Sequence, residues 1–160
     1  MTLSTKPTIN GTWIIERQLS SWSNGLFPHE SMDLCVSLRI ENGNLFYHSV
    51  NRSNPDAPPS HFRFDIPLDN CSYPFTGSQR FDHLRGRLLP DGALEILKLQ
   101  DGAIVIAEIW RRHNDHLLFR WGVSCSAPQS PKARKPIRNI SAPSSPTEPD
   151  LMLRRSEPGR

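Results

Sequence analysis

Three arginines and one histidine have the type and spacing that could bind an anion. His83, Arg85 and Arg87 lie two residues apart in the segment Gln79–Leu89, and Arg63 lies in a shorter segment of similar character. Residues two apart on an extended strand share one face. If that face points into a protein interior, the guanidinium groups can meet a ligand carboxylate through charge-assisted hydrogen bonds. We therefore take Arg63, His83, Arg85 and Arg87 as candidate ligand-binding residues.

The same segment allows two other interpretations. The opposite face carries small or apolar residues, namely Leu84, Gly86 and Leu88. If these point inward, the charged row is a solvated outer face. Alternatively, His83 could form an acid–base site with Asp65 or Asp82, since a histidine beside a carboxylate can move protons in a pocket.

The remaining chemistry-bearing residues favour binding over catalysis. His113 and His116 flank a turn with no thiolate or further ligand nearby, so we predict no metal site. The sequence contains no phosphate-binding loop, dinucleotide-binding pattern, nucleophile elbow or zinc-protease motif. We expect no cofactor and no catalytic residue.

Alternation of apolar and polar residues predicts the strands that hold these side chains. In Met32–Ile40 every second residue is apolar, which is typical of an antiparallel strand with one solvated side. No segment has a sustained helical period. The eight predicted strands cover Thr12–Leu19, Met32–Ile40, Leu45–Asn51, His61–Ile66, Gln79–Leu89, Ala93–Leu99 and the two arms of Asp101–Val123.

The segment Asp101–Val123 is the longest predicted hairpin, with two apolar arms around the turn His113–Asp115. Eight antiparallel strands with short connections favour an all-β, eight-stranded up-and-down barrel. A sandwich of two sheets is the competing architecture.

Charge separates the chain into two parts. Residues 1–123 contain 12 Lys+Arg and 13 Asp+Glu, whereas residues 124–160 contain 7 and 3. Nucleic-acid binding needs a clustered basic face, so we expect none from the folded domain.

The segment after Ser124 holds 7 of the 15 prolines, so we predict a disordered basic tail over 125–160. It could attract an acidic protein partner. Truncation after Ser124 is expected to leave the unfolding midpoint nearly unchanged.

The three cysteines form no close pair, and neither a signal peptide nor a membrane span is evident. We therefore expect a cytoplasmic protein with a flexible N-terminus over 1–9 and one barrel domain over 10–124.

Gly11-Thr12-Trp13, at the start of the first predicted strand, resembles the G-x-W signature of the calycin superfamily, which includes lipocalins, cytosolic fatty-acid-binding proteins and avidins. In lipocalins an arginine of the last strand packs over this tryptophan. The resemblance implies a cation–π pair between Trp13 and Arg120, with Arg111 and Arg112 as alternative partners.

Barrel width and the many aromatic residues favour non-catalytic binding of a small apolar or amphipathic molecule, with or without a carboxylate. One alternative is a filled barrel that acts as an interaction module through its basic tail. A second is a small enzyme that uses the region of His83.

Overall fold

The computed structural model describes residues 8–20, 29–123 and 150–156. They form ten strands and two single-turn 3-10 helices. The strands are β1 (Gly11–Ile15), β2 (Leu34–Glu41), β3 (Asn44–Asn51), β4 (Ser60–Pro67), β5 (Asp69–Pro74), β6 (His83–Leu88), β7 (Leu94–Gln100), β8 (Ala103–His113), β9 (His116–Val123) and β10 (Asp150–Arg155). The 3-10 helices are η1 (Arg17–Leu19) and η2 (His29–Ser31).

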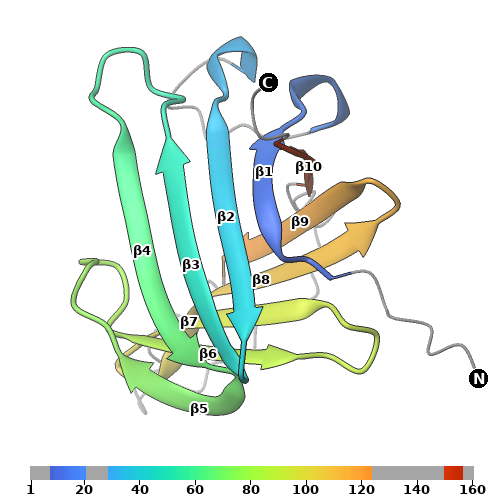
Figure 1. Ribbon diagram of the computed structural model, residues 1–160. Helices are drawn as coiled ribbons and strands as arrows, with labels where there is room; N and C mark the ends of the chain where they lie inside the picture. The colour runs from blue at the N-terminus through green and yellow to red at the C-terminus, as the bar shows by residue number, and fades with distance from the viewer. Residues whose placement is uncertain (1–7, 21–28, 124–149, 157–160) are drawn as a thin grey trace, which may run out of the picture.

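All ten strands belong to one antiparallel sheet in the order β4-β3-β2-β1-β10-β9-β8-β7-β6-β5. Strands β1 to β4 form one wall and β6 to β9 cross behind it at a steep angle (Figure 1). The sheet thus curls into a nearly closed barrel. Its two edge strands, β4 and β5, are consecutive in the chain. The predicted all-β barrel is confirmed, but the predicted count of eight strands is wrong.

Strand β10 is the main departure from the expected architecture. It lies between β1 and β9, pairing Trp13 with Arg155 and Phe119 with Leu151. The side chains of Leu151 and Leu153 are 3% and 0% exposed. The prediction of a disordered tail over 125–160 is therefore wrong for residues 150–155, because alternate leucines give this short segment an apolar face. The rest of that range, apart from Ser156, lies outside the described residues.

The second unexpected strand, β5, differs in character. Its sequence DNCSYP is mostly exposed, and its pairing with β6 is irregular between Asp69 and Ser72. A strand with so little apolar alternation gives no period-two pattern. Its position depends mainly on the β5–β6 ladder, and Tyr73 is its one side chain that packs against the core.

Trp13 fills the barrel beside β10. Its ring is fully buried, and its Nε1 donates a hydrogen bond to the carbonyl oxygen of Ile9 at 2.9 Å. Ile9 is itself buried at 3% exposure, although it falls in the N-terminus predicted to be flexible. The guanidinium carbons of Arg112 and Arg155 lie 5.0 and 5.2 Å from the centre of the Trp13 ring.

The expected pairing of Trp13 with Arg120 is corrected by this geometry. Phe119 is buried in the core, so the neighbouring Arg120 is directed to the outer face, where it is exposed. One predicted alternative, Arg112, takes its place together with Arg155 from β10. Gly11 permits this approach: it has φ +142°, and a Cβ there would lie 3.3 Å from Nε of Arg155.

Candidate functional site

The predicted anion-binding row lies on the outer face of the barrel. Leu84 is 1% exposed and Gly86 is also buried, so Arg85 and Arg87 point away from the interior. Arg87 is exposed and forms an ion pair with Glu95 on β7, with Nε and Oε1 2.7 Å apart. The row thus lies on the outer face, where Arg87 is exposed but Arg85 is half-buried, with its Nε buried and without a hydrogen-bond partner among the described residues. The binding role of these residues stays a prediction.

His83 also lies on the outer side, next to one of its two predicted acid–base partners. Its Nδ1 is 2.8 Å from Oδ1 of Asp82, and both side chains are partly exposed. The hydrogen bond from His83 is the main cause that lowers the pKa of Asp82, and the backbone N–H of Asp101 adds to it. The other proposed partner, Asp65, lies on β4 and is exposed.

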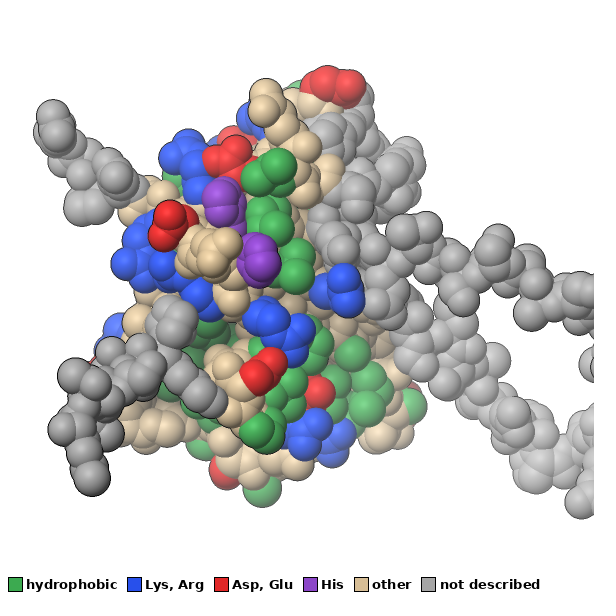
Figure 2. All heavy atoms as spheres, turned by 90° about the vertical axis from the view of Figure 1, so that its right-hand side faces the viewer, with side chains coloured by type: hydrophobic (Ala, Val, Ile, Leu, Met, Phe, Trp, Pro, Cys, Tyr) green, Lys and Arg blue, Asp and Glu red, His purple; other side chains and the backbone are tan. Residues whose placement is uncertain are grey.

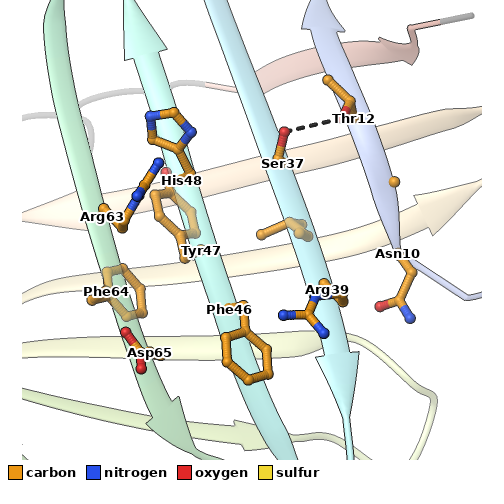
Figure 3. Close-up of a pocket in the computed structure, with 12 residues that line it drawn as sticks. Asn10, Thr12, Ser37, Arg39, Phe46, Tyr47, His48, Arg63, Phe64 and Asp65 are labelled. Carbon is orange, nitrogen blue, oxygen red and sulfur yellow. Dashed lines mark hydrogen bonds between the residues drawn. The ribbon is translucent and has the colours of Figure 1, made fainter. Parts of the chain in front are cut away.

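Arg63 contributes to an open groove on the outer face of β1 to β4, with a volume of about 730 Å³. Figure 3 shows this groove, with Phe46 beside Arg39 and with His48 beside Arg63. The Arg39 guanidinium lies 4.0 Å from the Phe46 ring centre. Burial, followed by the charge of Arg63, lowers the pKa of His48. The structure thus places Arg63 in this groove, apart from the three candidate residues on β6.

A charged pair that the sequence did not single out lies inside the barrel. Lys98 on β7 and Glu108 on β8 form an ion pair, and their side chains are only 12% and 6% exposed. Lys98 is paired across the strands with Leu84, and Glu108 with Ile96, so both share the inward face. Burying two charges is expensive unless they are paired and hydrogen-bonded. Such a pair in a mostly apolar interior is the strongest candidate for a functional site among the described residues.

Two aromatic rings lie close to the Lys98 ammonium. Nζ of Lys98 lies 5.1 Å from the ring centre of Phe62 and 5.3 Å from that of Phe81. Phe75 contacts both rings, with centroid separations of 5.3 Å to Phe62 and 5.4 Å to Phe81. These cation–π contacts stabilise the ammonium where water is scarce.

The carboxylate of Glu108 has aromatic neighbours with polar groups. Nε1 of Trp110 donates to Oε2 of Glu108 at 3.4 Å. Tyr47, on the opposite wall, meets the Trp110 ring edge-on at a centroid distance of 6.0 Å. Burial, followed by the negative charge of Glu108, raises the pKa of Tyr47 above its ordinary range. The phenol therefore stays neutral and can donate or accept a hydrogen bond inside the barrel.

Phe62, whose ring centre lies 5.1 Å from Nζ of Lys98, stands at the seam between β4 and β5. These strands are the two ends of the hydrogen-bonded sheet, and Phe62 and Phe75 are only partly buried there. Farther along β4, Ile66 packs so tightly on β6 that a Cβ added to Gly86 would lie 3.0 Å from its Cδ1. Side chains therefore close the seam in place of ladder hydrogen bonds.

Among the described residues there is no group of three or more side chains suited to hold a metal ion, and none of the described helices is long enough to span a membrane. Figure 2 shows basic and acidic side chains interspersed on one face. In the part of the chain that the structure describes, Arg111 forms an ion pair with Asp91 at 2.8 Å, and Arg154 forms one with Glu16 at 2.7 Å.

Comparison with solved structures shows the fold. The chain is similar to a variant of the fluorescent protein UnaG, with a TM-score of 0.59 and 11% identity, over 94% of this chain and 97% of that chain. It is also similar to the fatty acid transporter REP1-NXSQ, with a TM-score of 0.55 and 9% identity, over 94% of this chain and 97% of that chain. No protein family and no curated protein sequence matches it. The chain therefore shares the barrel fold of these two proteins, which is the fold that the resemblance of Gly11-Thr12-Trp13 to the calycin signature implies.

Proposed function

We propose that this protein binds a small apolar or amphipathic molecule inside its barrel, without catalysis. The observation that carries the proposal is the buried Lys98–Glu108 pair among aromatic side chains. Small-molecule sites usually combine many apolar side chains with a few convergent polar groups, and this pair among phenylalanine rings has that composition. The similarity of the fold to a protein named as a fatty acid transporter supports the same class of ligand.

The seam between β4 and β5 supplies the access route in this proposal. Phe62, Phe75 and Phe81 contact one another through their rings, so rotation of their side chains opens the seam without breaking backbone hydrogen bonds. Side-chain rotation is fast compared with the opening of a strand ladder. A ligand would then replace ring-to-ring contacts with contacts to its own apolar body.

Two measurements test this function. Native mass spectrometry of the protein purified from its own host should detect a retained small molecule. The neutral dye Nile red should bind saturably, and Phe62→Ala should speed both its association and its dissociation. Phe46→Ala removes the same ring from the outer face of β3 and should leave these rates unchanged. Absence of both a retained molecule and saturable dye binding would overturn the proposal.

The enzymatic alternative has one supporting observation, the contact between His83 and Asp82 at 2.8 Å. Both side chains are on the outside and partly exposed, where solvent weakens their effect on a bound substrate. The interaction-module alternative depends on the basic tail over 125–160, most of which lies outside the described part of the chain. It stays a prediction.

A further inference from the structure

We propose that the Lys98–Glu108 pair makes the barrel select a neutral polar head group, one that both donates and accepts a hydrogen bond, over a carboxylate. This inference rests on the proposed function, because it concerns the same interior site. It names the class of ligand: long apolar molecules that end in a hydroxyl or a primary amide.

The charges of the two side chains at the site balance. Lys98 and Glu108 carry opposite charges and are both buried, so the site is neutral overall but strongly polar. The guanidinium groups of Arg112 and Arg155 lie on the Trp13 ring. Arg112 is four residues beyond Glu108 on the same strand, about 13 Å at the usual rise. A ligand that reaches Lys98 therefore meets the pair before it meets these arginines.

Lys98 and Glu108 can form more hydrogen bonds than they have. An ammonium has three donors, and a carboxylate has about four acceptor positions. Glu108 accepts from Lys98 through Oε1 and from Trp110 through Oε2, the latter at a long 3.4 Å. Both partners thus keep capacity for one more bond. A hydroxyl or amide can accept from Lys98 and donate to Glu108 at the same time, leaving the ion pair intact.

A carboxylate cannot do both. It has no proton to donate to Glu108 and would compete with it for the one ammonium. Two carboxylates would then share a site of low water content, which is unfavourable unless one of them is protonated. A cationic head group would meet the same difficulty beside Lys98. The site therefore discriminates by charge and not by chain length.

The test compares three probes with the same eighteen-carbon chain: oleate, oleamide and oleyl alcohol. Each displaces Nile red from the protein at pH 7.5. We expect the two neutral probes to bind the unmodified protein more tightly than oleate, by about tenfold or more. Glu108→Gln keeps the shape and removes the negative charge, so oleate should gain about tenfold and become the preferred probe.

Glu95→Gln is the matched control, since Glu95 lies on the outer face of β7 and pairs with Arg87. It should leave the order of affinities unchanged. If Glu108→Gln unfolds because Lys98 loses its partner, the double variant Lys98→Gln/Glu108→Gln replaces it. That variant has no charge to discriminate with and should bind oleate and oleamide with similar affinity.

The outcomes separate this inference from the proposed function. If oleate binds the unmodified protein as tightly as oleamide and Glu108→Gln changes nothing, the selection of neutral head groups is overturned while ligand binding stands. The same holds if Glu95→Gln shifts the affinities as Glu108→Gln does. If neither Nile red nor any of the three probes binds, the proposed function fails and this inference falls with it.

Discussion

Replacement of Leu153 by alanine tests whether β10 belongs to the folded barrel. Leu153 is fully buried and is paired across the strands with Ile15 and Leu117. Leu→Ala in a packed core costs about 2–5 kcal/mol of unfolding free energy. For a chain of this size, 1 kcal/mol lowers the unfolding midpoint by about 2–4 °C. We therefore expect the midpoint of Leu153→Ala to fall by roughly 4 to 20 °C.

The control is the next residue in the same strand. Met152 faces outward opposite Leu118 and is only partly buried. Met152→Ala should cost less than about 1 kcal/mol. Thermal unfolding followed by tryptophan fluorescence gives the midpoints of both variants. Urea unfolding gives their free energies, and similar slopes with denaturant would show that unfolding exposes a similar surface in each.

Equal and small effects of the two substitutions would refute the reasoning. So would a chain truncated after Pro149 that unfolds at the unchanged midpoint, the behaviour expected for a disposable tail. In either case β10 would contribute nothing to the closure of the barrel, and β1 and β9 would have to tolerate unpaired edges.

Two further predictions concern single contacts. A hydrogen bond from Tyr73 to Asp69 at 2.5 Å raises the pKa of Tyr73 to about 12. The contribution of this hydrogen bond to stability is therefore present below pH 10 and is lost as the pH rises through about 12. NMR titration of the Tyr73 ring should show the raised pKa. Asp69→Asn should bring that pKa back toward 10. Arg155→Gln should cost about 0.5–1 kcal/mol because its guanidinium leaves the Trp13 ring. Arg120→Gln should lower the unfolding free energy by less. If urea unfolding gives equal losses for the two variants, Arg120 contributes as much as Arg155, and the predicted contact of Arg120 with Trp13 would be supported instead.

The barrel could be predicted wherever one face of a strand is apolar and the other is not. Strand β2 is the clearest case, because its alternation in Met32–Ile40 matches its observed burial pattern. Strand β10 has the same signal in Leu151 and Leu153, but it is only six residues long and follows a proline-rich segment. The proline-rich composition of residues 125–160 predicts disorder, and the apolar alternation of six residues is too short to outweigh it.

The interior pair could not be found in this way. Both faces of β7 are largely apolar, since Leu94 and Ile96 alternate with a face that carries Leu97 and Leu99. Nothing in such a strand indicates which side Lys98 takes, and the pairing of β7 with β8 shifts register between Lys98 and Leu99. For β6, in contrast, two interpretations were open, and the burial of Leu84 and Gly86 distinguishes them.

The position of β10 has a consequence for the order of events during synthesis. Strands β1 to β9 follow one another along the chain, but the ladder that joins β1 to β9 comes from residues 150–155. A ribosome adds about 5–20 residues per second, so a nascent chain spends at least a second or two with nine strands synthesised and the edges of β1 and β9 unpaired. Such edges are templates for pairing with other chains. We expect newly made chains to be most prone to aggregation, and most in need of a chaperone, in this interval.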